Sequence, residues 1–283
     1  MKKIWLLISI LLYPLSSVSV LSAPVSGINS FSYTENKDSK FLSGFQILIR
    51  RDHQENDFPK QIKTFLHKPK NSTDDHRHYS RTRSSNNTFD LNEVEAGFLF
   101  FDNFLIYGKA GFGKFESDLM ILDETISGLY TSPSKFHVKD DSMVSFGGGL
   151  AFKMFEKEVN SIFKHLNAHL DFKYNKITID AKKQGRNNLT YEADLDELQA
   201  GVVLTGSTDH IKVFLGPRVS SITGDEKLYI EKEDFLYEEK IKTSKNIGWI
   251  FGISFFAKDR YSLAIQKRIG DEEGVSFEAQ IKF

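Results

Sequence analysis

EGVSFEAQIKF, residues 273–283, has an apolar side chain at every second position from Val275 onward. The apolar set comprises Val275, Phe277, Ala279, Ile281 and Phe283, and the residues between them are Ser276, Glu278, Gln280 and Lys282. Successive side chains of a β-strand point to opposite faces. The spacing therefore predicts a strand with one apolar face and one polar face that ends on an aromatic residue.

The same period of two recurs along the chain, in 92–101 (NEVEAGFLFF), 165–175 (HLNAHLDFKYN), 196–206 (DELQAGVVLTG) and 246–256 (NIGWIFGISFF). Taken together, the alternating segments predict about ten strands, each near the ~9–11 residues that a tilted strand needs to cross a membrane. The expected strands are 41–50, 91–101, 104–116, 142–154, 165–179, 192–205, 210–221, 246–257, 260–269 and 274–283.

The links between these strands alternate in length. FDNF, STDH and AKDR are short, whereas residues 51–88, 119–140, 182–190 and 223–245 make long polar links. Short turns on one side and long loops on the other are typical of an outer-membrane barrel. We therefore expect an all-β fold, a transmembrane antiparallel up-and-down β-barrel of about 10 strands, with 8 or 12 as alternatives. The arms of 223–245 also alternate, so they can extend their hairpin beyond the membrane.

The composition narrows the function classes. The chain has 283 residues, with 37 Lys and Arg against 38 Asp and Glu, so it offers no overall attraction to nucleic acid. It has no Cys, which removes disulfides and thiolate zinc sites and suits an exported protein. Phe is abundant, with 25 residues, and Phe favours strands.

The N-terminus has the features of a secretory signal peptide. Lys2 and Lys3 precede an apolar run from Ile4 to Leu12, Pro14 breaks the run, and small residues follow. An uncleaved membrane anchor is the alternative, since 4–23 carries no charge. We expect residues 1–22 to be a cleaved signal peptide, 23–40 a periplasmic segment and 41–283 the barrel.

The last strand resembles the C-terminal signature of bacterial outer-membrane β-barrel proteins in its alternating apolar residues and final Phe. The resemblance implies a location in the outer membrane of a Gram-negative-type bacterium, with lipid and lipopolysaccharide as neighbours. It implies that the barrel-assembly machinery reads an assembly signal in the last strand, which then pairs with the first strand near 41–50. That signal consists of Val275, Phe277, Ala279, Ile281 and Phe283. A soluble β-sandwich also alternates, but here the polar faces carry charged and small residues on nearly every strand.

If the apolar faces contact lipid, the polar faces line the lumen. The expected lumen-lining residues are Arg50, Glu93, Glu95, Lys109, Lys153, His169, Asp171, Lys173, Glu197, Lys212, Arg218, Arg268, Glu278 and Lys282. Two interpretations of this lumen remain. In the first, the barrel is so narrow that the opposite charges pair and form a salt-bridged plug, because an unpaired buried charge is costly. In the other, the basic excess lines a narrow, slightly anion-preferring channel for small solutes.

We find no convincing enzyme site or cofactor site in the sequence. Residues 74–78 (DDHRH) bring carboxylate and imidazole groups together, but without the spacing of a metal site. Omptin-type outer-membrane proteases are similar in length, and need carboxylate pairs and an Asp–His pair at the outer rim. The poor matches here are Asp194 with Asp196, Asp140 with Asp141, His169 with Asp171, and Asp209 with His210. We expect a non-enzymatic protein that contacts its surroundings through surface loops, with any extracellular ligand unidentified.

Overall fold

The computed structural model describes residues 42–67, 77–101, 103–125, 134–159, 162–184, 188–230, 235–242, 247–257, 261–270 and 273–283. The predicted signal peptide (1–22) and periplasmic segment (23–40) lie outside these residues, as do Asp74, Asp75 and His76. In this part of the chain, no helix has the length and hydrophobicity needed to span a membrane.

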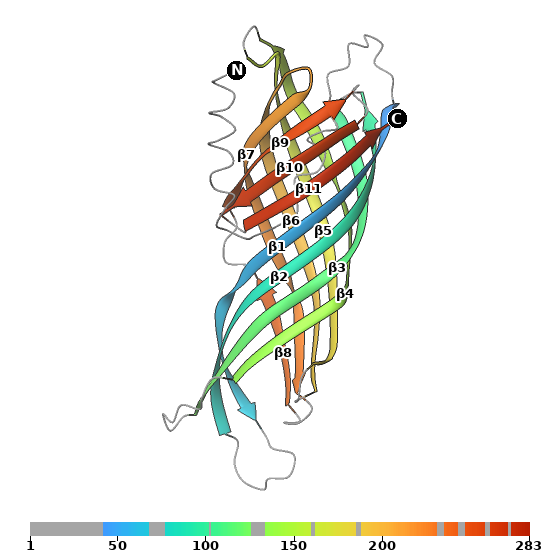
Figure 1. Cartoon of the computed structure of the whole chain (residues 1–283). Coiled ribbons are helices and arrows are strands. Elements are labelled where there is room, and N and C mark those ends of the chain that lie inside the picture. The colour runs from blue at the N-terminus through green and yellow to red at the C-terminus, as the bar shows by residue number, and fades with distance from the viewer. Residues whose placement is uncertain are drawn as a thin grey trace, which may run out of the picture.

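The described chain forms eleven strands in one antiparallel sheet (Figure 1). They are β1 (Leu42–His67), β2 (Arg77–Phe100), β3 (Phe104–Thr125), β4 (Ser134–Glu158), β5 (His165–Gln184), β6 (Leu189–Ser207), β7 (Ile211–Ile230), β8 (Phe235–Lys242), β9 (Ile247–Ala257), β10 (Tyr261–Ile269) and β11 (Glu273–Lys282).

Pairing of the first strand with the last closes the sheet into a barrel. β1 pairs with β11, and β6 pairs with β7. β8 and β9 pair one after the other along β7, so together they fill a single position in the wall. The barrel therefore has ten wall positions, which confirms the predicted fold class and the predicted pairing of the last strand with the first.

The strands run obliquely round the barrel. Following the hydrogen-bonded partners once round the wall from Ser207 leads back to Leu195 on the same strand, a shift of 12 residues (207 minus 195). Such a shift tilts the strands, as in other closed barrels. Because of this tilt, residues at different positions along their strands lie at the same level of the barrel axis, where their inward side chains can meet.

The prediction of four long loops was wrong. Most of 51–88, 119–140, 182–190 and 223–245 is strand, and β1 to β7 are each 19 to 26 residues long. The expected hairpin arms in 223–245 are confirmed, because β8 pairs with Thr223–Ile230. The strands continue because the alternation of side chains continues, with the polarity of the two faces exchanged.

The exchange is visible on the inward face of single strands. On β2 the buried residue changes from Leu91 to Glu93, and on β6 it changes from Leu195 to Glu197. All four side chains point to the inside of the barrel, because burial alternates along each strand. The interior is therefore largely apolar at one end of the barrel, with a few hydrogen-bonded polar groups such as Glu226, and charged farther along.

The outward face changes in the opposite sense at the same level. On β2 the exposed residue changes from Asn92 to Val94, and on β6 the outward residue changes from Asp196 to the exposed Leu198. From this level an apolar outer belt runs to the side of the short links. We call the part of the barrel on the other side of this level the extension.

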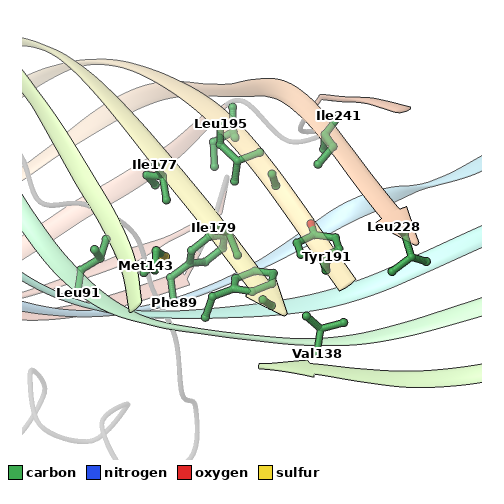
Figure 2. Close-up of a cluster of buried hydrophobic side chains, with 14 of the residues drawn as sticks. Phe89, Leu91, Val138, Met143, Ile177, Ile179, Tyr191, Leu195, Leu228 and Ile241 are labelled. Carbon is green, nitrogen blue, oxygen red and sulfur yellow. The ribbon is translucent and has the colours of Figure 1, made fainter. Parts of the chain in front are cut away.

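The extension has an apolar core (Figure 2). The ring of Phe115 on β3 stacks on that of Tyr191 on β6, with centroids 5.5 Å apart and planes 9° apart. The core joins side chains of β2, β3 and β4 to those of β5, β6, β7 and β8. It comprises Phe89, Leu91, Phe115, Val138, Met143, Ile177, Ile179, Ala181, Leu189, Tyr191, Ala193, Leu195, Ile222, Leu228 and Ile241.

Candidate functional site: the barrel interior

A charged layer fills the barrel next to the extension core. Arg50 on β1 lies at its centre, with Nη1 3.2 Å from Glu93 Oε2, Nη2 3.6 Å from Glu95 Oε2 and Nε 3.3 Å from Glu278 Oε1. Lys109 Nζ lies 2.6 Å from Glu93 Oε1. These groups come from four strands, so closure of the barrel is what assembles them.

Further polar pairs surround this centre. Arg268 Nη2 donates to Asp52 Oδ1 over 2.7 Å, and the Tyr107 hydroxyl donates to Asp171 Oδ1 over 3.2 Å. Gly149 makes room for the Tyr107 ring, because a Cβ at this position would collide with the phenol. Mutual pairing of buried charges offsets part of the cost of removing them from water.

Glu197 on β6 anchors a second part of the layer. It accepts hydrogen bonds from Gln199 Nε2 (2.5 Å) and Asn175 Nδ2 (3.4 Å). The positive charges of Lys173, Lys109 and Arg218 also act on it. The layer is therefore a network of mixed sign.

Twelve of the predicted lumen-lining residues are buried in the structure. They are Arg50, Glu93, Glu95, Lys109, His169, Asp171, Lys173, Glu197, Lys212, Arg218, Arg268 and Glu278. Lys153 and Lys282 are half-buried, and Lys153 Nζ lies 2.8 Å from Glu156 Oε2 near the end of β4. Reasoning from sequence missed Asp52, because it fell in a predicted loop. Asp52 is two residues from Arg50, so continuing the strand past residue 50 would have placed both side chains on the inward face.

Apolar side chains lie on both sides of the charged layer. Along β3 the buried residues run from Leu105 through Lys109 to Phe115, and along β7 they run from Phe214 through Arg218 to Ile222. On the side of the short links, the apolar groups form two clusters. These are Leu99, Leu105, Tyr107 and Ala151, and Val203, Phe214 and Ile250. These two clusters share that end of the interior with buried polar side chains, among them Gln46, His169 and Lys212, whereas the extension core lies on the other side of the charges.

The outer belt is apolar on every wall strand. It runs from Leu166 to Tyr174 on β5 and from Val144 to Met154 on β4, the length that a tilted strand needs to cross a bilayer. Phe112, Phe146, Phe172 and Phe277 are all about half exposed or more. An apolar exterior around a charged interior is the reverse of a soluble protein, and it is what lipid requires of a closed sheet.

The chain is an outer-membrane β-barrel. The short links then face the periplasm, and the extension stands on the extracellular side. Lys164 and Asp209 mark the periplasmic end, with Nζ 2.7 Å from Oδ1. The hydrogen bond from Lys164 holds the pKa of Asp209 below its ordinary value.

The acidic residues considered for an omptin-like site do not converge in the structure. Asp194 and Asp196 point to the outer face, where they accept hydrogen bonds from the hydroxyls of Thr178 (2.8 Å) and Tyr174 (2.5 Å). Asp140 points inward and accepts hydrogen bonds from the backbone N–H groups of Ser142 (2.8 Å) and Asp180 (3.0 Å). The wall of the barrel therefore separates Asp140 from Asp194 and Asp196.

The other two pairs lie far from the outer rim. His169 is buried near the periplasmic end and lies 3.5 Å from Thr205 Oγ1, whereas Asp171 belongs to the charged layer. Asp209 and His210 lie in the periplasmic link between β6 and β7. Among the residues that the structure describes, no three His, Cys, Asp or Glu side chains gather as metal ligands. Asp74, Asp75 and His76 lie outside the described residues, and the structure does not describe the side chain of His78.

Comparison with known proteins finds outer-membrane barrels. The outer membrane protease OmpT from Escherichia coli is 8% identical, with 85% of this chain and 94% of OmpT covered and a TM-score of 0.49. The outer membrane protein OprG from Pseudomonas aeruginosa is 11% identical, with coverage of 87% and 98% and a TM-score of 0.43. An outer membrane channel from Pseudomonas putida F1 is 10% identical, with coverage of 89% and 100% and a TM-score of 0.33. No family model and no curated protein matches the chain.

Proposed function

We propose that this barrel is a non-conducting, non-enzymatic protein of the outer membrane. Its membrane part serves as an anchor, and its extension contacts the surroundings of the cell. The observation that carries the proposal is the packing of the charged layer. The side chains of Arg50, Glu93, Glu95 and Lys109 each have 0% exposure, so no water-sized space touches them.

The apolar residues around the layer support the same conclusion. An ion that enters from the extension must leave water to pass the extension core before it reaches the charged layer, and an unpaired charge in such surroundings is costly. A porin-like channel needs a continuous polar path. The interior therefore favours the salt-bridged plug over the narrow channel.

The extension supports a role at the cell surface. Its strands continue well beyond the outer belt and pack around a core, so it presents a folded surface. Folded elements hold their side chains in fixed relative positions, as recognition of a partner requires. The alternative of an omptin-like protease finds no support in these acidic residues, because Asp140 points into the barrel whereas Asp194 and Asp196 point out of it.

Planar-bilayer recording of the purified full chain tests the proposal. We expect no discrete current steps from the wild-type protein. Stable steps with anion preference would replace the proposal with the narrow channel. An assay with fluorogenic peptides tests the enzyme alternative, and we expect no turnover. Peptide cleavage that is lost in Asp194→Ala or Asp196→Ala would overturn the non-enzymatic assignment.

A further inference from the structure

A groove of about 470 Å³ lies on the outer face of the barrel, across the junction of the first and last strands. It crosses four neighbouring strands, β1, β11, β10 and β9. Its lining includes Ile49, Ala279, Ile281, Leu263, Tyr261 and Phe255. The volume falls in the range of about 300–1,000 Å³ that is typical of ligand sites.

The register of the strands explains the hollow. Ala279 pairs with Ile49 on one side and with Leu263 on the other, and all three point outward. Ile49 is 60% exposed and Leu263 is 62% exposed. A methyl group between two projecting branched side chains leaves a trough. Ala257 on β9 pairs with Tyr261 on β10 and lines the same groove, so a second small side chain lengthens the trough.

The chemistry of the groove is that of a hydrocarbon site. Two polar residues, Ser262 and Gln280, take part in its lining, but their side chains are engaged elsewhere. Ser262 Oγ donates to Gln280 Oε1 (3.1 Å), and Gln280 Nε2 donates to Gln46 Oε1 (2.8 Å), which is buried. The surface that the groove offers to a ligand is therefore apolar.

The position of the groove identifies its occupant. It is continuous with the apolar outer belt, so it opens to the bilayer and only molecules dissolved there reach it. It also lies at the periplasmic end, because Tyr261 is the first residue of β10 and Ile281 is close to the end of β11. The lipid on that side is phospholipid.

We propose that the groove binds one acyl chain of a phospholipid from the periplasmic leaflet. The chain lies over Ala279 between Ile49 and Leu263, and so contacts the first and last strands together. Because β1 and β11 close the barrel, the bound chain stabilises the closed wall. This site is independent of whether the lumen conducts.

Native mass spectrometry of the full-length protein, reconstituted with phosphatidylethanolamine and phosphatidylglycerol and then extracted in detergent, tests the site. We expect the wild-type protein to retain one phospholipid, and Ala279→Phe to reduce the retained fraction roughly tenfold, a loss of one decade of affinity. Ala110→Phe is the matched control, since Ala110 is also exposed on the outer belt but on β3, and it should retain lipid as the wild type does.

Ala279 belongs to the predicted assembly signal, so a second filling variant, Ala257→Phe on β9, keeps the test decisive. Folding is checked for each variant by its mobility in unheated gels. Equal lipid retention in all four proteins would mean that only bulk lipid binds, and would overturn the site. A wild-type dimer that both filling variants convert to monomer, without lipid, would assign the groove to a second copy of the chain and also overturn it.

Discussion

Arg50 and Glu278 are 228 residues apart in the sequence, and their side chains meet inside the barrel with Arg50 Nε 3.3 Å from Glu278 Oε1. The pair joins β1 to β11, and the same guanidinium also contacts Glu93 and Glu95 on β2. Formation of the charged layer is thus linked to closure of the barrel, because Arg50 on the first strand contacts carboxylates of the second strand and of the last strand.

Arg50→Leu tests this linkage. The substitution leaves three buried carboxylates without the guanidinium that they share, and loss of one partner from a buried pair costs about 3–5 kcal/mol. We expect the free energy of unfolding in lipid vesicles, measured by urea titration, to fall by about this amount. Lys164→Ala removes a cation from an exposed pair at the periplasmic end and should change it little. Equal effects of the two substitutions would contradict the central role of Arg50.

Phe115→Ala tests the core of the extension. The residue is fully buried and stacks on Tyr191, so truncation leaves a cavity that costs about 3–5 kcal/mol. We expect faster amide hydrogen exchange in the extension, with the membrane part still protected. Phe112→Ala is the control, because Phe112 is three residues away on the same strand but 67% exposed on the outer belt. Unchanged exchange in Phe115→Ala would show that the core does not hold the extension together.

Phe98→Arg and Asn92→Arg test the position of the membrane boundary. Both residues lie on the exposed face of β2, but Phe98 is in the outer belt and Asn92 is in the extension. An Arg at the bilayer midplane costs about 2–4 kcal/mol, and the cost decreases toward the interface. We therefore expect Phe98→Arg to lower the unfolding free energy clearly more than Asn92→Arg. The reverse order would place the membrane on the other side of the boundary.

Lys164→Ala also has a consequence for titration. The ammonium group stabilises the charged form of Asp209, so its pKa is lowered in the folded protein. We expect the substitution to raise the Asp209 pKa toward the ordinary value of about 3.9. Because the folded-state pKa is the lower one, the stabilisation from this pair is present above the ordinary value and disappears as the pH falls through the lowered pKa. Chemical-shift titration of the Asp209 carboxyl in both proteins measures the effect, and identical curves would contradict the contact.

The sequence predicted the wall strands because a period of two is a local property. From Val94 or Leu198 it indicates which side chains point outward, and from Glu93 or Glu197 it indicates which point inward, without knowledge of the neighbours. The fold class and most of the interior residues followed from this rule. The same rule was not carried far enough: Val138 and Leu189 keep the inward spacing, but the segments that contain them, 119–140 and 182–190, were predicted as polar loops.

By itself, then, the sequence determined the alternation, the order of the strands and the two chemically distinct faces of each strand. Only the tertiary structure decided which residues meet, as Arg50 meets Glu278 and Phe115 meets Tyr191. The physical reason is the shift of 12 residues round the closed wall, which no single strand encodes. The closed wall also stands partly in lipid and partly in water, and the polarity of its outer face changes between these two parts. The inward face carries charges at one level and an apolar core at the next.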